Sequence, residues 1–286
     1  MYCRAVLPTA GLGNKLFPWA RCRVYALQRG IRMLAPTWTQ VKPGPWLRGD
    51  RDKRLYHNLF SPAPPGYISG VHQLWVRLLD RQVVLFKGAG DHFATLTGWD
   101  QILLAELKNM TRQRWLHRAD EIGSVALGVH VRRGDFVQAR SADDFIFNGA
   151  VRTPLQWFVQ SIEAIRDISG NLVPAIVVSD ATDAALRDLL SIKGVERADT
   201  GSAVGDLLVL ARARMLIGSG GSSFSAWAAF LGQMPTVAFP GQSLSWFNIA
   251  PSQGQYIGEW SHSGPIPPLL QQQIQTLFEP APRVLV

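Results

Sequence analysis

The sequence VALGVHVRRGDF occupies residues 125–136 and decides most of the fold assignment. Its first five residues, 125–129, are apolar and predict a short buried strand. The charged residues that follow are then expected where this strand ends and opens into a loop. Because ligands of open α/β sheets bind at the carboxyl ends of the strands, the sequence places a candidate site here.

Arg132 and Arg133 are the residues of this stretch that best suit an anionic ligand. Adjacent guanidinium groups present forked N–H donors that match phosphate oxygens, and His130 can add a further hydrogen bond. The combination favours a diphosphate. A surface ion-pair cluster that includes Asp135 is the alternative, and this stretch alone does not decide between them.

Length and composition indicate a folded protein with an anionic ligand. The chain has 286 residues, enough for one large core or two domains, and its 47% hydrophobic and 17% charged residues exclude a disordered chain. A formal net charge of +8 attracts anions. No Lys/Arg-rich run or zinc-ligand cluster supports nucleic-acid binding. A phosphorylated small molecule in a local basic pocket is the simpler prediction.

The cysteines and the hydropathy of the chain indicate the cellular compartment in which we expect the protein. Cys3 and Cys22 are the only cysteines, and we expect both to be buried free thiols in the first strand and the first helix. No Cys and His spacing is typical of a metal site. The opening residues lack a secretory pattern, and no apolar run approaches the roughly 20 residues that span a bilayer. We therefore expect a cytoplasmic protein without metal, cofactor or membrane span.

Strands and helices alternate along the chain, which predicts parallel βαβ units and an α/β fold. Residues 36–72 are the exception, because their prolines, glycines and charges predict irregular loops. We expect a domain boundary near residue 120, giving units 1–120 and 121–286. The other expected elements are strands at 3–8, 82–87, 175–179, 215–217 and 236–239, a tight turn at 11–13, and helices at 14–30, at 100–117 and after residues 155, 180 and 223.

Two glycine-containing segments are expected at helix N-termini. In Gly11-Leu12-Gly13-Asn14 the glycines would let a ligand approach the backbone, or would serve packing between helix and strand. Gly218 to Ser223 precedes a second helix, where exposed amides and serine hydroxyls make a phosphate cradle or a serine cap. Phe224, Trp227 and Leu231 have the spacing of core residues.

Asp180 closes the strand at 175–179. Its carboxylate could accept hydrogen bonds from a nucleobase or ribose. It could equally cap the helix that follows, since Asp is a favoured N-cap residue.

Taken in order, these four segments resemble the α-1,2-fucosyltransferases and the wider group of α-1,6- and protein O-fucosyltransferases. The residues that carry the resemblance are Gly-Leu-Gly-Asn, His-Val-Arg-Arg-Gly-Asp, a strand ending Ser-Asp, and Gly-Ser-x-x-Ser-Ser-Phe-Ser-x-Trp-Ala-Ala-x-Leu, spread over residues 10–232. The resemblance implies a GT-B fold with two Rossmann-like domains facing a cleft. It also implies metal-independent, inverting transfer of fucose from GDP-fucose, the donor substrate, to a glycan hydroxyl, with α-1,2 linkage expected.

The resemblance also implies roles for individual residues. Arg132 would clamp the β-phosphate as a catalytic residue, while His130 would contact the nucleotide and Asp180 would bind guanine or ribose. Asp135 is the second catalytic candidate, because it lies beside the arginine motif. The remaining residues would hold phosphate or line the cleft: Ser222 and Ser223, and Gly11, Gly13 and Asn14. On this division, the unit 121–286 binds the GDP-sugar and the unit 1–120 faces the carbohydrate acceptor.

The sequence leaves open the acceptor, the general base and two alternative functions. Lys15 stands where the α-1,2 enzymes usually carry glutamine, and residues 36–72 match no known pattern, so the acceptor is not assigned. Asp135, Asp143 and Asp144 are candidates for a general base by proximity alone. The alternatives are a transferase of the same fold with another nucleotide sugar, and a nucleotide-binding protein without transfer activity.

Overall fold

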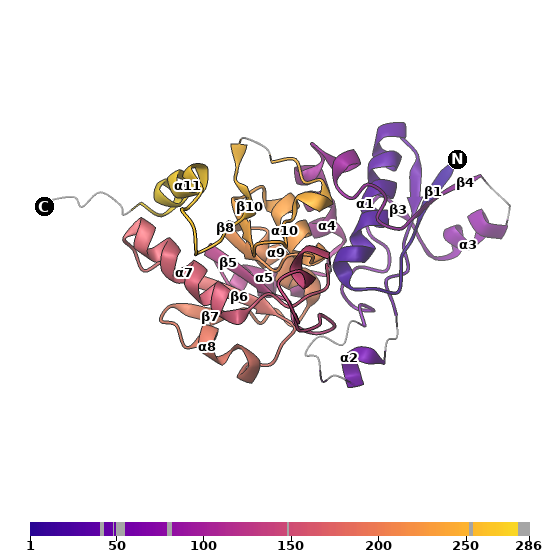
Figure 1. The fold of residues 1–286 in the computed structure, drawn as a ribbon. Helices are drawn as coiled ribbons and strands as arrows, with labels where there is room; N and C mark the ends of the chain where they lie inside the picture. The colour runs from indigo at the N-terminus through magenta and orange to yellow at the C-terminus, as the bar shows by residue number, and fades with distance from the viewer. Residues whose placement is uncertain are drawn as a thin grey trace, which may run out of the picture.

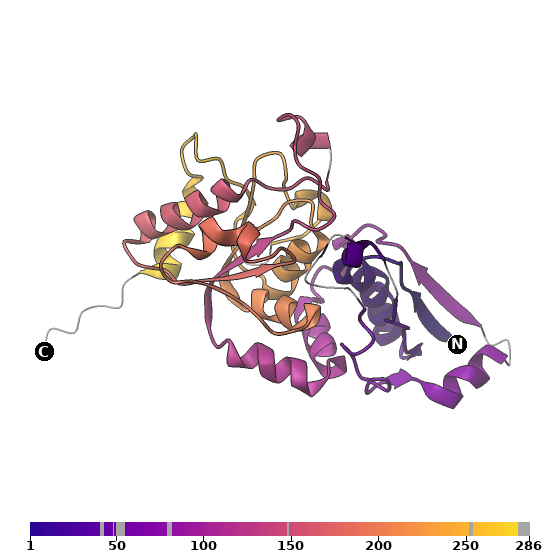
Figure 2. The same ribbon diagram turned by 90° about the horizontal axis from the view of Figure 1, so that it is seen from below.

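The protein contains two parallel β-sheets, each covered by helices (Figures 1 and 2). In the computed structural model, residues 1–40, 43–47, 49, 55–78, 82–147, 149–251 and 254–279 are described. The first sheet belongs to the N-terminal part of the chain and the second to the C-terminal part. The expected α/β class with two Rossmann-like units is confirmed.

The N-terminal sheet has four strands in the order β3-β2-β1-β4, all parallel. Its main helix is α1, which follows β1 and ends at Gly30, where a left-handed backbone with φ of 61° closes the last turn. The elements of this unit are β1 Tyr2–Val6, α1 Leu12–Arg29, β2 Arg32–Leu34, α2 Gly44–Leu47, β3 Tyr67–Ile68, α3 Gly70–Leu78, β4 Val83–Lys87 and the 3₁₀ helix η1 Ala94–Leu96.

The C-terminal sheet has six parallel strands in the order β10-β9-β8-β5-β6-β7. Central strand β5, Val125–Val131, pairs with β6 on one side and β8 on the other, so its carboxyl end opens at the middle of the sheet. The other elements are α4 Asp100–Met110, α5 Gln113–Glu121, α6 Asp144–Phe147, α7 Leu155–Ser169, β6 Ala175–Ser179, η2 Ala184–Leu186, α8 Arg187–Leu190, β7 Val195–Arg197, α9 Ala203–Leu210, β8 Ala213–Gly218, α10 Ser223–Gly232, β9 Thr236–Ala238, η3 Ser245–Phe247, β10 Ile257–Glu259 and α11 Pro268–Phe278.

The two units share one continuous hydrophobic cluster. Helix α10 packs against both α1 and α4 at the junction, where Figure 1 shows the three helices between the sheets. Phe93 of the N-terminal unit stacks on Phe230 with ring centroids 4.4 Å apart, and its ring edge meets Trp227 at 4.7 Å. The Trp227 indole also donates a 2.8 Å hydrogen bond to the Gly13 carbonyl. This aromatic contact fixes the two sheets relative to each other.

The structure corrects three of the predicted boundaries. The turn expected at 11–13 is wrong, because α1 already begins at Leu12 and only Gly11 is extended. The strand expected at 125–129 continues through His130 and Val131. The single helix expected at 100–117 is two helices, because the backbone at Thr111 is extended. There the Met110 carbonyl accepts from Ser61 and the Arg112 amide donates to Leu59, so contacts with another segment replace helical bonds.

Other expectations about the core are confirmed. Cys3 and Cys22 are buried free thiols, in β1 and α1 as expected. Residues 36–72 contain only short elements among those described, which agrees with the prediction of irregular loops. The short strands β2, β3, β7 and β10 and the helices α9 and α11 were not predicted. The division at residue 120, which lies within α5, stays a prediction.

Candidate active site

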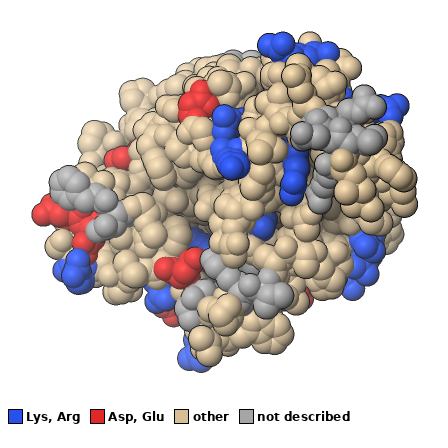
Figure 3. Space-filling view, turned by 90° about the vertical axis from the view of Figure 1, so that its right-hand side faces the viewer, with Lys and Arg blue, Asp and Glu red and all other residues tan. Residues whose placement is uncertain are grey.

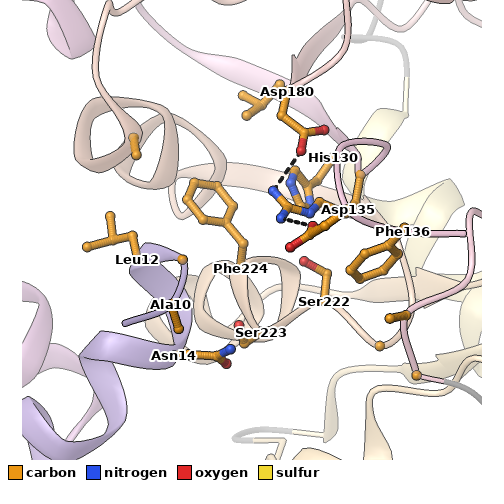
Figure 4. Close-up of a pocket in the computed structure, with 18 of the residues that line it drawn as sticks. Ala10, Leu12, Asn14, His130, Asp135, Phe136, Asp180, Ser222, Ser223 and Phe224 are labelled. Carbon is orange, nitrogen blue, oxygen red and sulfur yellow. Dashed lines mark hydrogen bonds and ion pairs between the residues drawn. The ribbon is translucent and has the colours of Figure 1, made fainter. Parts of the chain in front are cut away.

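Arg132, the first residue after β5, lies between two carboxylates. Its guanidinium forms an ion pair with Asp180 at 2.7 Å and a second, very short one with Asp135 (Figure 4). The Arg132 amide donates to the Ser219 hydroxyl at 2.8 Å, which ties the end of β5 to the end of β8. The ion-pair cluster considered from the sequence is therefore present. It is partly buried, with 19% of the Arg132 side chain exposed, and it orients the guanidinium into a pocket.

Asp180 follows β6 and supports the arginine loop rather than a helix. Its carboxylate accepts a 2.9 Å hydrogen bond from the Arg133 amide and pairs with Arg132, and its side chain is only 8% exposed. The residue that precedes η2 is Asp183, so the alternative of a helix cap at Asp180 is wrong. A contact of Asp180 with guanine or ribose stays a prediction.

His130 is a buried, neutral imidazole beside the same loop. Its Nδ1 lies 2.7 Å from the Ser225 hydroxyl, and its ring contacts that of Phe224 in a tilted arrangement with centroids 4.9 Å apart. Burial, with a smaller effect from the positive charge of Arg132, lowers the pKa of His130 to about 3. The imidazole therefore stays uncharged at neutral pH and offers hydrogen bonding without charge.

The N-terminus of α10 opens into the pocket without a side-chain cap. Ser222 occupies the N-cap position, yet its hydroxyl makes no capping bond, and among the described residues the amides of Ser223 and Phe224 have no hydrogen-bond partner. Free amides at the positive end of a helix dipole bind anions. Gly221 shapes the preceding turn, because its φ is 66° and a Cβ there would lie 1.7 Å from the Gly149 carbonyl oxygen.

The N-terminus of α1 meets that of α10 at the pocket, and its two glycines have different roles. A Cβ on Gly13 would lie 2.6 Å from the Ser223 hydroxyl and 2.8 Å from its carbonyl carbon, so Gly13 serves helix–helix packing. Gly11 has no atom within 4 Å of its ideal Cβ position and lines open space. Asn14 lies beside Ser223 in Figure 4. Gly13 therefore serves packing, against a helix and not the expected strand, and close approach of a ligand to the backbone at Gly11 stays a prediction.

All nine residues predicted for the site line one pocket of about 500 Å³ between the two units. A pocket of this size is typical of small-molecule and cofactor sites. The nine are Gly11, Gly13, Asn14, His130, Arg132, Asp135, Asp180, Ser222 and Ser223. Of the other carboxylates considered, neither Asp143 nor Asp144 lines this pocket, and Asp144 is bonded to the Arg140 amide at 2.7 Å.

Several pocket residues were not found from the sequence. Asp206 lies in an apolar run of the sequence, on α9, and lines the pocket. The hydroxyl of Thr200, which precedes α9, donates to it at 2.7 Å. Phe224 was assigned to the core but is half-buried and lines the pocket, whereas Trp227 and Leu231 are fully buried. Tyr56, His92, Phe136, Trp246 and Phe247 also line the pocket.

Lys15 lies one helical turn beyond Gly11 and is only 2% exposed. Its ammonium donates a 2.8 Å hydrogen bond to the Pro8 carbonyl. Among the described residues, no group of three or more His, Cys, Asp or Glu side chains could hold a metal ion.

Two parallel sheets with a pocket between them are the arrangement expected of the GT-B fold. The chain belongs to glycosyl transferase family 11, whose family model matches residues 94–262. This match covers the arginine loop, the end of β6 and the start of α10. The predicted resemblance is therefore confirmed at the level of the family.

The fold of this chain is similar to that of solved structures. The NodZ α-1,6-fucosyltransferase soaked with GDP-fucose is 15% identical, with a TM-score of 0.52, over 83% of this chain and 94% of that chain. Fucosyltransferase NodZ from Bradyrhizobium is 15% identical, with a TM-score of 0.52, over 84% and 96%. POFUT1 in complex with GDP-fucose is 13% identical, with a TM-score of 0.46, over 84% and 97%. At these identities the NodZ likeness establishes the fold.

Among curated proteins, none matches this chain significantly. Within the described part of the chain, the structure contains no helix whose length and apolar character would let it cross a membrane.

Proposed function

We propose that this protein transfers fucose from GDP-fucose to a hydroxyl of a glycan acceptor, without a metal ion and with inversion at the anomeric carbon. The observation that carries the proposal is the meeting of the Arg132 guanidinium and the uncapped α10 N-terminus at one pocket. Both present N–H donors to the same space, which suits the two phosphates of a nucleoside diphosphate. The α-1,2 linkage rests on the order of the four sequence motifs.

The proposed mechanism stabilises the leaving group. As the acceptor oxygen attacks the anomeric carbon, the bond from that carbon to the β-phosphate oxygen breaks and negative charge grows on GDP. Arg132 and the amides of Ser223 and Phe224 meet this charge in a partly enclosed pocket. Because Asp135 and Asp180 both pair with Arg132, we propose that they hold the guanidinium in position before the donor arrives.

The two walls of the pocket divide the substrates in this proposal. Unit 121–286 carries His130, Arg132, Asp180, Ser222 and Ser223 and binds the nucleotide, with Gly11, Gly13 and Asn14 closing the cleft from the other side. Unit 1–120 faces the acceptor. On the face that Figure 3 shows, described Lys and Arg side chains are scattered among uncharged residues. The described side chains on this face form no continuous basic surface of the kind that binds nucleic acid.

Calorimetry and transfer assays test the proposal together. We expect GDP and GDP-fucose to bind, UDP-sugars and short oligonucleotides to bind much more weakly, and fucose to be transferred to an acceptor within a glycan panel. Activity should persist in excess EDTA. GDP binding without transfer would support a nucleotide-binding protein instead, and preference for another nucleotide sugar would support a different transferase. Loss of activity in EDTA that Mn²⁺ restores would refute metal independence.

A further inference from the structure

His92 lies on the loop between β4 and η1 and lines the pocket from the N-terminal unit. Its backbone is left-handed, with φ of 56°. Residues other than glycine rarely adopt this conformation, although Asn, Asp and His tolerate it better than most. Such strain persists only where the surrounding structure enforces it, and it concentrates at functional sites.

Hydrogen bonds on both sides of His92 enforce this conformation. The Asp91 carbonyl accepts from the Asn248 side chain at 3.1 Å, and the Phe93 amide donates to the Phe247 carbonyl at 3.0 Å. Both partners belong to the C-terminal unit, directly after β9 and its loop. The position of His92 is therefore fixed relative to the wall that carries Arg132.

The His92 imidazole is surrounded by aromatic rings but bonded to none of the described residues. Its centroid lies 5.3 Å from Phe17, 5.3 Å from Trp246 and 5.2 Å from Phe247, each in edge-on geometry. The other partly or fully buried imidazoles differ, since His130 contacts Ser225 at 2.7 Å and His262 contacts Ser161 at 3.0 Å. The His92 nitrogens are thus left for a ligand in the pocket.

Trp246 lies next to His92 on the same pocket and is 52% exposed. An indole of this size normally buries more of its surface, and a half-exposed one beside a pocket offers a flat apolar face to a ligand. Sugar rings present a comparable apolar face of C–H groups. A polar group with free nitrogens and an aromatic platform therefore stand side by side.

We propose that His92 and Trp246 form the acceptor subsite, to which the C-terminal unit contributes only Trp246. The Trp246 indole seats the acceptor sugar ring and His92 is the general base. This inference rests on the proposed function. The acceptor oxygen bonds to the anomeric carbon, the bond to the β-phosphate oxygen breaks, and its electron pair leaves with GDP. The hydroxyl proton passes to a nitrogen of the neutral imidazole, which then returns it to solvent.

The charges around His92 are compatible with a neutral base. Burial lowers the pKa of His92 below its usual value of 6.5, and Asp91 acts in the opposite direction. From α1, Arg21 lies against Gly90 and donates to the Lys87 carbonyl, while η3 contributes only Ser245, Trp246 and Phe247. The carboxylates Asp135 and Asp206 belong to the opposite wall and are bonded to Arg132 and Thr200.

Replacing His92 by Asn and by Asp gives a matched pair, because both residues tolerate the left-handed backbone and only Asp supplies a base. We expect His92→Asn to lower kcat about 10²- to 10⁴-fold while GDP affinity, measured by calorimetry, changes less than about threefold. The parent's kcat/KM should rise with pH to a plateau, through a pKa below 6.5, and His92→Asn should lose this limb. His92→Asp should recover part of kcat, with the limb moved to lower pH.

The role of Trp246 is tested by the acceptor KM. Trp246→Ala should raise the acceptor KM about tenfold or more and leave GDP affinity unchanged, and Trp246→Phe should recover part of the loss. If the parent protein transfers no fucose to any acceptor, the proposed function fails and not this subsite alone. If the parent transfers fucose while His92→Asn keeps its kcat and pH limb, or loses GDP affinity together with kcat, the assignment of His92 as the base is overturned.

Discussion

The two walls of the pocket are built from the same kinds of elements but differ in how they present them. In the C-terminal wall, the loop after β5 and the start of α10 expose a guanidinium and unbonded helix amides. In the N-terminal wall, the start of α1 is partly occupied: the Leu12 amide donates to the Tyr56 hydroxyl at 2.9 Å and Gly13 packs on Ser223. One helix N-terminus is therefore open to an anion, whereas the other helps to form the wall itself.

The largest expected effect tests the C-terminal wall. Arg132→Ala should lower transfer by orders of magnitude while the protein still folds, because charge-assisted bonds to the departing diphosphate are lost. Arg132→Lys should recover only part, since an ammonium lacks the planar fork that bridges two oxygens. Transfer kinetics beside a thermal unfolding curve measure both quantities. Near-normal turnover of Arg132→Ala would show that the guanidinium does not stabilise the departing diphosphate. The C-terminal wall would then lose the role that distinguishes it.

Asp180 tests whether the C-terminal wall is pre-organised. Asp180→Ala removes the partner of Arg132 at 2.7 Å and of the Arg133 amide at 2.9 Å. We expect GDP affinity to fall by about 1.5–3 kcal/mol, the range for a lost bond to a charged group. Asp180→Asn should recover part, because its oxygen can still accept from the Arg133 amide. Calorimetric titration with GDP measures whether the affinity falls or rises in these variants. Tighter binding would mean that Asp180 competes with phosphate for Arg132.

The sequence predicts some of the pocket residues and not others, because only some of them stand beside a recognisable sequence pattern. Arg132, Asp180 and Ser222 each follow an apolar run that predicts a strand, and the carboxyl ends of parallel strands meet at one sheet edge. Their convergence could therefore be predicted. His92 lies in a loop and Trp246 in the three-residue 3₁₀ helix η3, where the sequence shows no periodicity. Their proximity depends on the junction between the units. Contacts between distant segments of this kind leave no local pattern in the sequence.

The same reasoning explains the incorrect helix prediction at 100–117. The apolar spacing of Leu103 and Leu107 is helical, and both are buried in α4 as expected. The break comes from Thr111, whose hydroxyl donates to the Leu107 carbonyl at 2.7 Å and which pairs with Phe60 as an isolated antiparallel bridge. The partner segment lies about fifty residues away in the chain. Apolar periodicity indicates which face of a helix is buried. It does not indicate that a segment distant in the sequence, here the one around Phe60, pairs with the backbone and ends the helix.

The smallest expected effect concerns the N-terminal wall and uses its two glycines as a matched pair. A methyl group on Gly13 would approach the carbonyl carbon of Ser223 to 2.8 Å and the amide nitrogen of Phe224 to 2.9 Å. Backbone atoms cannot move aside by changing rotamer, so α1 and α10 must separate and strain the 2.8 Å bond from Trp227 to the Gly13 carbonyl. We expect Gly13→Ala to destabilise the protein by about 1–3 kcal/mol, the usual cost of overpacking, although alanine itself favours a helix by about 1 kcal/mol.

Gly11→Ala is the control for this pair. Its methyl group would meet no atom within 4 Å, and its φ of −62° is accessible to any residue, so we expect the stability to change by less than about 0.5 kcal/mol. Thermal or chemical unfolding of both variants measures the difference. Equal stability of the two would show that the α1 N-terminus does not depend on close contact with α10. Packing of α1 on α10 would then not distinguish the two walls, and their contrast would rest on the Leu12–Tyr56 hydrogen bond alone.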